Sequence, residues 1–429
     1  MPLPDVQEFS DIACTRCGCV CDDLKVTVAD NRIVKFSPGC SLAEPWFQSL
    51  EQPPSTLPAE VGGHPTALED ALLHAAGILR ESKAPLFFGL SRSSTDGQRA
   101  ACELADYLGA VIDTTASIGH GPSIMAFQAA GESTCTLGEI RHRSDLVVYW
   151  GSDPVTTHPR HLERVVERPG LYRRHGRSDR RLIVIDSAPT ASSAAADQFI
   201  RIEPGSDFEV LWVLRGLIAD VQIPDGTYGG VPLSVLRKFA DELRNSHYGA
   251  IFFGVQLADG PSGHCSVEAL LRLVTDLNLH TRFVVRRMRV PGDVTGADSV
   301  LCWQTGYPFS VNLSRGYPRY SPGEYSAGPM LARGETDCLV LVGGERIARL
   351  PESSQARLRD IPVIQLDPPG VCCEIPAVVR FNTAIYGIHR RATAYRMDEV
   401  PIPLRQILHS DLPSDDEVLR TLLRMLKET

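Results

Sequence analysis

PLFFGLSRSSTDGQRAACELADYLGAVID, residues 85–113, is the stretch that decides the fold. Two apolar runs, PLFFGL (85–90) and AVID (110–113), flank a segment with helical spacing, GQRAACELADYLG (97–109). Apolar runs without polar alternation are typical of strands that are covered on both faces, and a helix between two of them favours a parallel crossover. The stretch therefore predicts one strand-helix-strand unit of an α/β sheet.

The same pattern recurs along most of the chain. Several of the apolar runs end in Gly, Asp or Ser, at the sheet edge where open α/β folds bind ligands. A chain of 429 residues has room for several domains of this kind. We therefore expect an α/β multi-domain architecture, whose further strands are DLVVYWG (145–151), RLIVIDS (181–187), AIFFGV (250–255), RFVVR (282–286), CLVLVGG (338–344) and PVIQLD (362–367).

The N-terminal part has a different character. LKVTV (24–28) and RIVKF (32–36) predict a β-hairpin within a cysteine-rich segment. QPPSTLPAEVGGHP (52–65) is rich in Pro and Gly and is typical of a linker, and helical periodicity begins at residue 66. We predict a small cysteine-rich cap over residues 1–50 and α/β domains over residues 66–429.

Charge and hydropathy exclude several classes of function. The net charge of −9 argues against a broad nucleic-acid surface, because phosphate binding needs a basic field. No stretch reaches the roughly 18 apolar residues of a membrane span, and the first residues lack the basic and apolar parts of a leader. We expect a cytoplasmic protein with neither nucleic acid nor membrane as a partner.

The cysteines near the N-terminus have the spacing of a metal site. Three closely spaced thiols, Cys14, Cys17 and Cys21, are followed by Cys40, with Cys19 as a spare. Such a set can hold a 4Fe-4S cluster, because a short loop supplies three ligands and a second loop supplies the fourth. A structural zinc site and a set of thiols that binds nothing are the alternatives.

Two loops complete the list of candidate sites. SIGHGPS (117–123) follows the strand AVID and places His120 between glycines, which suits either a ligand contact or a structural hydrogen bond. Residues 300–329 have many Gly, Pro and aromatic residues and no periodicity, as expected for an ordered functional loop.

These blocks carry a family resemblance. ACTRCGCVCDDL (13–24), SIGHGPS, LVVYWGSDPVTTHPRHLERV (146–165), RLIVIDSAPTASSAAADQFIRIEPGSDFEVL (181–211) and VTGADSVLCWQTGYPFSVNLSRGYPRYSPGE (294–324) resemble the B subunit of formylmethanofuran dehydrogenase. The resemblance implies a fold like that of the molybdopterin oxidoreductases, with a 4Fe-4S cluster on Cys14, Cys17, Cys21 and Cys40. It also implies that pterin-nucleotide contacts lie near Gly151, Asp186 and residues 204–207.

One position departs from the family pattern. Catalytic members bind molybdenum or tungsten through a Cys or selenocysteine in a Cys-His-Gly-Pro-Ser loop, and here that position is Gly119. Glycine has no donor for a soft metal, so no molybdenum or tungsten is expected. The resemblance implies that His120 matches the family's active-site His and Arg289 its partner Arg, and both are then residues of a relic site or of the polar wall of a different cavity.

The departure favours the non-redox branch of the family. The resemblance then implies the B subunit of a bacterial formyltransferase/hydrolase complex, whose partners would be a zinc-dependent formyl hydrolase (the A subunit), the C subunit, and a formyltransferase (the D subunit). Its carrier would be methylofuran, whose polyglutamate tail suits arginine forks. The alternatives are a free-standing iron-sulfur protein and an active molybdenum or tungsten dehydrogenase subunit. Candidate carrier-binding residues are Arg286, Arg287, Arg289, Arg315 and Arg319, with a second basic run at Arg173, Arg174, Arg177, Arg180 and Arg181.

Overall fold

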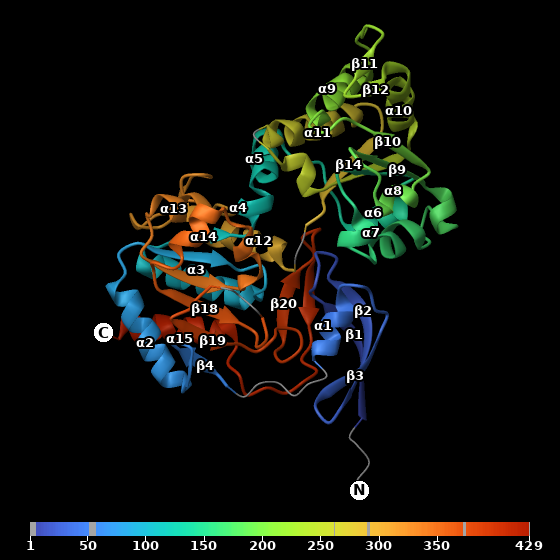
Figure 1. Ribbon diagram of the computed structural model, residues 1–429. Coiled ribbons are helices and arrows are strands. Elements are labelled where there is room, and N and C mark those ends of the chain that lie inside the picture. Colours follow the sequence, from blue (N-terminus) through green and yellow to red (C-terminus); the bar gives the residue numbers. More distant parts are fainter. Residues whose placement is uncertain (1–5, 51–56, 261, 290–291, 372–374, 429) are drawn as a thin grey trace. The chain divides into compact units, whose positions relative to one another are not determined.

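A computed structural model describes residues 6–50, 57–260, 262–289, 292–371 and 375–428. The chain divides into two compact units, each built around its own sheet (Figure 1). Unit 1 combines Met1–Ile118 with Pro291–Thr429, and unit 2 is Gly119–Val290. The chain therefore leaves unit 1 within the SIGHGPS loop and returns to it just after the run RFVVR.

The main sheet of unit 1 has nine strands in the order β16-β15-β7-β6-β17-β18-β19-β4-β5. The five central strands, β7 to β19 in that order, are parallel, and two antiparallel strands extend each edge. The order of the strands reverses between β6 and β17, as in doubly wound folds. The strands are β4 (Ala59–Val61), β5 (His64–Thr66), β6 (Pro85–Gly89), β7 (Val111–Thr114), β15 (Val311–Asn312), β16 (Arg319–Tyr320), β17 (Cys338–Val342), β18 (Val363–Asp367) and β19 (Val379–Asn382).

Helices cover both faces of this sheet because successive strand residues point to opposite sides. Phe87 packs into a core with helices α2, α3, α12 and α15, whereas its neighbours Leu86 and Phe88 pack on the other side with α13. The helical segment expected from residue 66 onward and the helix predicted at 97–109 are confirmed within a few residues. The helices are α2 (Leu68–Glu81), α3 (Thr95–Leu108), α12 (Val294–Thr305), α13 (Ala327–Arg333), α14 (Glu352–Arg357) and α15 (Asp415–Lys427).

Unit 2 contains a five-stranded parallel sheet in the order β10-β9-β8-β13-β14. One face buries a core against helices α5, α9, α10 and α11. The predicted strands of this part are confirmed, and the parallel direction is confirmed with them. Bounds are β8 (Leu146–Trp150), β9 (Arg181–Asp186), β10 (Gln198–Arg201), β13 (Tyr248–Phe253), β14 (Arg282–Arg287), α5 (Gly121–Ala130), α9 (Asp207–Ile218), α10 (Leu233–Asn245) and α11 (Gly263–Leu277).

The cysteine-rich segment folds onto a C-terminal hairpin. Strands β1 (Val6–Cys14), β2 (Cys21–Ala29) and β3 (Arg32–Ser37) form an antiparallel sheet, which confirms the predicted hairpin. Ala13 and Val20 share a small core with residues of β20 (Ala392–Tyr395) and β21 (Pro401–Leu404). Residues 1–50 as a separate domain remain a prediction, since their sheet packs on another part of unit 1.

Two segments differ from their sequence-based interpretation. The expected linker at 52–65 contributes the edge strands β4 and β5, because short Pro- and Gly-flanked runs can still pair at a sheet edge, while residues 51–56 lie outside the described residues. The loop at 300–329 includes the end of α12, the short strands β15 and β16, and the start of α13.

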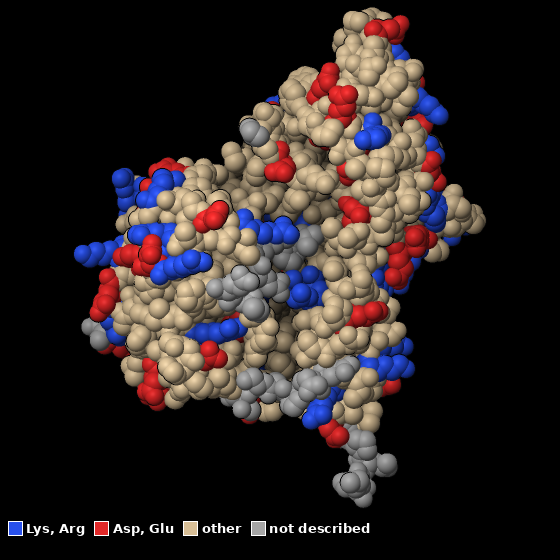
Figure 2. Space-filling model, viewed as in Figure 1, with Lys and Arg blue, Asp and Glu red and all other residues tan. Residues whose placement is uncertain are grey.

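One face of the surface can be followed in the space-filling view (Figure 2). Acidic and basic side chains are interspersed on the face drawn in Figure 2. Within the described residues, no helix is long and apolar enough to cross a membrane.

Candidate functional site

The switch point of the unit 2 sheet lies between β8 and β13. From β8 the chain continues to β9 and β10 on one side, whereas β13 is followed by β14 on the other. The loops that follow β8 and β13 begin here, at Gly151 and Gly254. They lie so close together that a Cβ on Gly254 would come within 2.2 Å of the carbonyl oxygen of Gly151. In open α/β sheets such a point is where ligands bind.

Two carboxylates lie at the same edge of this sheet. Asp186 ends β9, and its Oδ1 accepts a hydrogen bond from the Ser187 amide at 2.7 Å. Its Oδ2 is buried and has no hydrogen-bond partner among the described residues. Trp150 Nε1 donates to Asp207 Oδ1 at 2.7 Å, and burial raises the pKa of Asp207, with a smaller contribution from Asp186. A buried acceptor without a donor costs about 1–3 kcal/mol, so the pair suits a ligand with N–H donors, such as a nucleobase.

Two buried histidines lie on the opposite face of the sheet from the main core. His158 Nε2 is 2.9 Å from the carbonyl oxygen of Arg289, and burial lowers the pKa of His158 to about 4. The ring of His161 packs edge-on against Tyr149 and Phe252, and burial lowers its pKa to about 3. Since Nε2 of a neutral His158 can donate to a carbonyl, this contact fixes the backbone after β14.

Gly119 and His120 lie at the junction of two helices. Gly119 ends the single turn α4 (Ala116–Gly119) and is partly exposed. His120 precedes α5, is only 3% exposed, and accepts a hydrogen bond at its carbonyl from Ser123 Oγ at 2.8 Å. Position 119 offers no side-chain donor, so these residues do not fit a thiolate-bound molybdenum or tungsten ion.

The arginines near the end of β14 are internal. Arg286 is 2% exposed and donates to Thr134 Oγ1 at 2.5 Å. Arg287 forms a buried ion pair with Glu132 at 3.2 Å. Arg289 is also buried, at 3%. The guanidinium groups of Arg286 and Arg287 have structural partners within unit 2, and carrier binding by the three arginines stays a prediction.

The predicted metal ligands gather at the end of the N-terminal sheet. Cys14 and Cys21 are paired across β1 and β2, and burial, together with the neighbouring thiols of Cys17, Cys21 and Cys40, raises the pKa of Cys14. The spare, Cys19, lies within hydrogen-bonding reach of Cys17 and Cys21. Across the described ranges, no three His, Cys, Asp or Glu side chains are already arranged as a metal site. The donor set thus suits iron and sulfur chemically, and its spacing would have to tighten around a cluster.

The other two predicted carrier arginines lie in unit 1. Arg315 is exposed, and Arg319 packs over the ring of Tyr325 at 5.1 Å and donates to Ser314 Oγ at 3.2 Å. Stacked aromatic residues support the same segment, with the rings of Tyr307 and Tyr320 5.0 Å apart. The region between Ser310 and Ala327, here named the arginine loop, is therefore ordered and presents a cationic group to solvent.

The second basic run is largely occupied by internal contacts. Arg180 is 3% exposed and donates to the backbone carbonyls of Val166 and Arg168. Arg177 pairs with Asp197 at 2.9 Å. Most of this run therefore stabilises the fold of unit 2.

Sequence reasoning missed two groups of buried titratable side chains, one near the end of β7 and one in the segment that follows β8. Asp113, the last residue of AVID, is fully buried, and the two histidines of the HPRH segment are fully buried as well. The signals were present, because an Asp that ends a buried strand and a His-x-x-His spacing both mark candidate sites. Their partners lie far away in the sequence, so the patterns alone could not assign them a role.

Known proteins similar in sequence belong to two kinds of complex. The chain is 35% identical, over 99% of both chains, to the B subunit of tungsten-containing formylmethanofuran dehydrogenase 2 from Methanocaldococcus jannaschii. It is 33% identical to the protein of the same name from Methanococcus maripaludis, over 99% of this chain and 100% of that one. Identity with the B subunit of the formyltransferase/hydrolase complex Fhc from Methylorubrum extorquens is 25%, over 65% of this chain and 72% of that protein. No family model matches the chain.

Solved structures share the fold. The formyltransferase/hydrolase complex of Methylorubrum extorquens, crystallised with methylofuran, contains a chain that matches with a TM-score of 0.72 at 22% identity, over 86% of this chain and 99% of that one. Acetylene hydratase from Pelobacter acetylenicus matches with a TM-score of 0.70 at 11% identity, over 98% of this chain and 69% of that one. The predicted α/β multi-domain architecture is confirmed, and the chain shares its fold with these two proteins.

Proposed function

The chain belongs to the family of formylmethanofuran dehydrogenase B subunits, and we propose that it serves as a non-redox B subunit in a complex that handles formyl groups on a furan-amine carrier. The observation that carries this proposal is Gly119, which puts no thiolate at the turn between α4 and α5. Without that ligand the chain's own contribution is to build the complex and to retain the carrier.

The chemistry of the two branches differs in its electron balance. Hydrolysis of an N-formyl group adds water across the carbonyl-nitrogen bond and releases formate and the amine, so no electrons are exchanged. Oxidation of formate to carbon dioxide releases two electrons and needs a metal centre and an acceptor. A subunit without a metal ligand at position 119 fits the first reaction, which a hydrolase subunit of the complex would perform.

Carrier retention is assigned to the arginine loop of unit 1. An anionic polyglutamate tail would be held by charge-assisted hydrogen bonds to Arg315 and Arg319, and the ordered rings of Tyr307 and Tyr320 would stiffen the loop that bears them. The expected partners, in the cytoplasm, are the zinc-dependent hydrolase, the formyltransferase, and the C subunit of the same complex.

The second candidate function is an active tungsten or molybdenum dehydrogenase subunit. Two observations favour it. The sequence is 35% and 33% identical, over nearly the whole chain, to two proteins named as tungsten-containing. At the sheet switch point, Oδ2 of Asp186 has no hydrogen-bond partner among the described residues. Asp186 and Asp207 would hold the nucleotide part of a pterin cofactor, and the cofactor would supply electron transfer when bound. In this case another ligand would have to replace the missing thiolate.

One preparation tests both candidates. The complex is purified without oxygen, its tungsten, molybdenum, iron and zinc are measured, and released pterin is assayed. The non-redox proposal predicts zinc without tungsten, molybdenum or pterin, and formate release from formyl-carrier that is independent of a viologen acceptor. Stoichiometric tungsten or molybdenum with pterin and with viologen reduction would overturn it and establish the second candidate.

A further inference from the structure

Asp113 is a fully buried carboxylate in unit 1, one residue before the end of β7 (Val111–Thr114). Both of its oxygens are engaged. Oδ1 accepts hydrogen bonds from the amide of Ser310 at 2.9 Å and from its hydroxyl at 3.2 Å. Oδ2 accepts from Ser117 Oγ at 2.6 Å and from the Ala327 amide at 2.7 Å.

Three of these contacts close the arginine loop. Ser310 is the residue before β15, and Ala327 is the first residue of α13, so one carboxylate holds both ends of the loop. Ser310 has a positive φ of 50°, an unfavourable conformation for serine that the two bonds to Asp113 compensate. Ser326 extends the contact, because its hydroxyl lies 2.7 Å from that of Ser310 and accepts from the Gly323 amide at 2.8 Å.

The fourth contact reaches a different segment. Ser117 belongs to α4, the single turn that ends at Gly119. The Ser117 hydroxyl also lies 3.1 Å from the carbonyl oxygen of Thr114, so it is well placed to bridge the strand end and the turn. Asp113 therefore contacts both the arginine loop and the turn that carries the departure from the family pattern.

The choice of an acidic residue here follows from the donors. All four contacts come from neutral N–H or O–H groups, and an ionised carboxylate is acceptor-only at both oxygens. An asparagine would turn its amide nitrogen toward one pair of donors and break that pair. Burial without a cation is unfavourable for a carboxylate, and it raises the pKa of Asp113 to about 6. The position therefore accepts an energetic cost that four hydrogen bonds offset.

We propose that Asp113 is a positioning residue that holds the arginine loop and the turn α4 in one fixed arrangement, so that the loop is ordered before it meets the carrier. The carrier part of this inference rests on the proposed function of the loop. The positioning part concerns only the structure of unit 1 and can be tested without carrier.

The test uses the purified complex and hydrogen exchange measured by mass spectrometry. Asp113→Asn should speed amide exchange at least about tenfold in 310–327, since either orientation of the new amide loses a hydrogen bond to that loop, and Asp113→Ala, which removes both acceptors, should speed exchange in 116–119 as well. Asp415→Asn is the matched control, because Asp415 is also buried in unit 1 with a pKa of about 6 but contacts Ser93 instead. It should leave both segments unchanged.

Two milder variants test the contact with α4 separately from the contacts with the arginine loop. They also serve as a second test if Asp113→Asn does not fold. Ser117→Ala should speed exchange in 116–119 only, and Ser117→Thr, which keeps the hydroxyl, should restore the wild-type rate. Equal exchange in Asp113→Asn and Asp415→Asn, or no rescue by Thr, would overturn the positioning role.

Carrier binding is read separately from the same preparations. Weaker retention of carrier by Asp113→Asn, by about fivefold or more, is expected alongside the faster exchange. If wild-type complex retains no carrier, the proposed function fails while the exchange result still decides the role of Asp113. Faster exchange with unchanged retention would overturn the link between loop order and carrier.

Discussion

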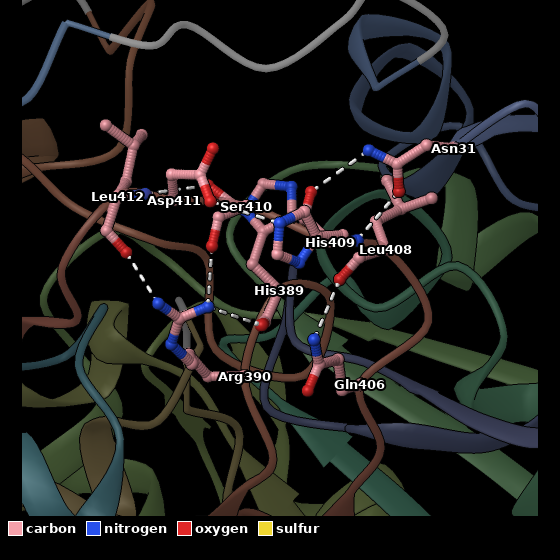
Figure 3. Close-up of polar contacts among 9 residues, drawn as sticks. All are labelled: Asn31, His389, Arg390, Gln406, Leu408, His409, Ser410, Asp411 and Leu412. Carbon is pink, nitrogen blue, oxygen red and sulfur yellow. Dashed lines mark hydrogen bonds and ion pairs between the residues drawn. The ribbon is translucent and has the colours of Figure 1, made fainter.

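Asn31 and His409, 378 residues apart in the sequence, hydrogen-bond each other in both directions: the Asn31 amide donates to the His409 carbonyl at 3.1 Å and accepts from the His409 amide at 2.7 Å (Figure 3). Asn31 occupies the turn between β2 and β3 with a φ of 58°. On the other side of the C-terminal segment, Arg390 donates to the carbonyls of Ser410 and Leu412. The N-terminal hairpin is therefore hydrogen-bonded to the segment 409–412, which Arg390 contacts through two further hydrogen bonds.

The first prediction concerns the contact between Asn31 and His409. Asn31→Ala should destabilise unit 1 by about 1–2 kcal/mol, since it removes two exposed hydrogen bonds and puts alanine, which tolerates positive φ less well than asparagine, at this position. Asn31→Gly keeps the backbone conformation and should cost about half as much. Thermal unfolding of both variants measures the difference, and equal stability of Asn31→Ala and wild type would show that the contact carries no free energy.

The sequence predicted those parts of the fold that depend on local pattern. Buried parallel strands such as β8 and β13 stand out as apolar runs, and α3 stands out through its periodicity. The edge strands β4 and β5 are only three residues long and are joined by two glycines, so the pairing of β4 with β19 and of β5 with β4 decides their structure. Contacts such as Asn31 with His409 arise only from the fold.

The second prediction separates the cluster ligands from the spare cysteine. If the cap binds an iron-sulfur cluster, Cys17→Ser should abolish the broad visible absorption and lower the iron content, and residues 6–37 should become protease-sensitive. Cys19→Ser, at an equally buried neighbour, should keep iron and absorption. Loss of iron in both variants would assign Cys19 a ligand role, and anaerobic wild-type protein without iron would leave these thiols without a cluster.

The third prediction concerns acid stability of unit 2. His158 and His161 titrate near pH 4 and pH 3 in the folded chain, below the ordinary pKa of 6.5, because both are buried. The unfolded chain therefore binds protons first as pH falls, and stability is lost between about pH 6.5 and pH 4. At 1.4 kcal/mol per pKa unit, each histidine contributes about 3 kcal/mol over this window.

The measurement compares unfolding free energy against pH in wild type and His161→Phe, which preserves the aromatic packing on Tyr149 and Phe252. The variant should lose about one proton from the slope between pH 6.5 and pH 4. Asp113 and Asp415, with a raised pKa of about 6, act in the opposite sense, but they are common to both proteins. The exposed His280→Gln serves as control, and an unchanged slope in His161→Phe would contradict the prediction.

The sequence can indicate candidate residues by their type, but it cannot show whether their side chains are buried or exposed in the fold. The cap cysteines lie close together at the end of the N-terminal sheet, and their role as metal ligands stays a prediction, as does carrier binding by the arginine loop. Arg286 and Arg287 looked like free basic groups, yet burial beside Thr134 and Glu132 gives them structural partners. Burial of an arginine depends on its tertiary neighbours, and sequence periodicity in a parallel strand does not reveal them.

The fourth prediction concerns Gly119→Cys. The added thiol should not by itself give viologen reduction, since a pterin-bound metal and an electron acceptor are needed as well. Tungsten, molybdenum and viologen reduction are measured on the variant complex beside wild type. A variant that gains metal and redox activity would show that the pterin site is already in use and would favour the dehydrogenase function.

The last prediction is that Arg315 and Arg319 retain the anionic carrier. Each carboxylate held by an arginine fork contributes about 1.5–3 kcal/mol when partly desolvated and much less when exposed, and the exposed Arg315 belongs to the weaker class. Arg315→Ala with Arg319→Ala should therefore lower carrier retention about tenfold at low salt, and added salt should weaken wild-type retention in the same direction.

The control pair comes from the second basic run. Arg174→Ala with Arg181→Ala removes the same charge from unit 2, at one exposed and one partly exposed position like the first pair, and should leave carrier content unchanged. Carrier content and formate release are measured for both double variants over a salt series. Unchanged carrier content and formate release in the Arg315 and Arg319 variant would reject the arginine loop as the site. A loss of carrier in the control variant alone would place the tail on unit 2, because both variants remove the same charge.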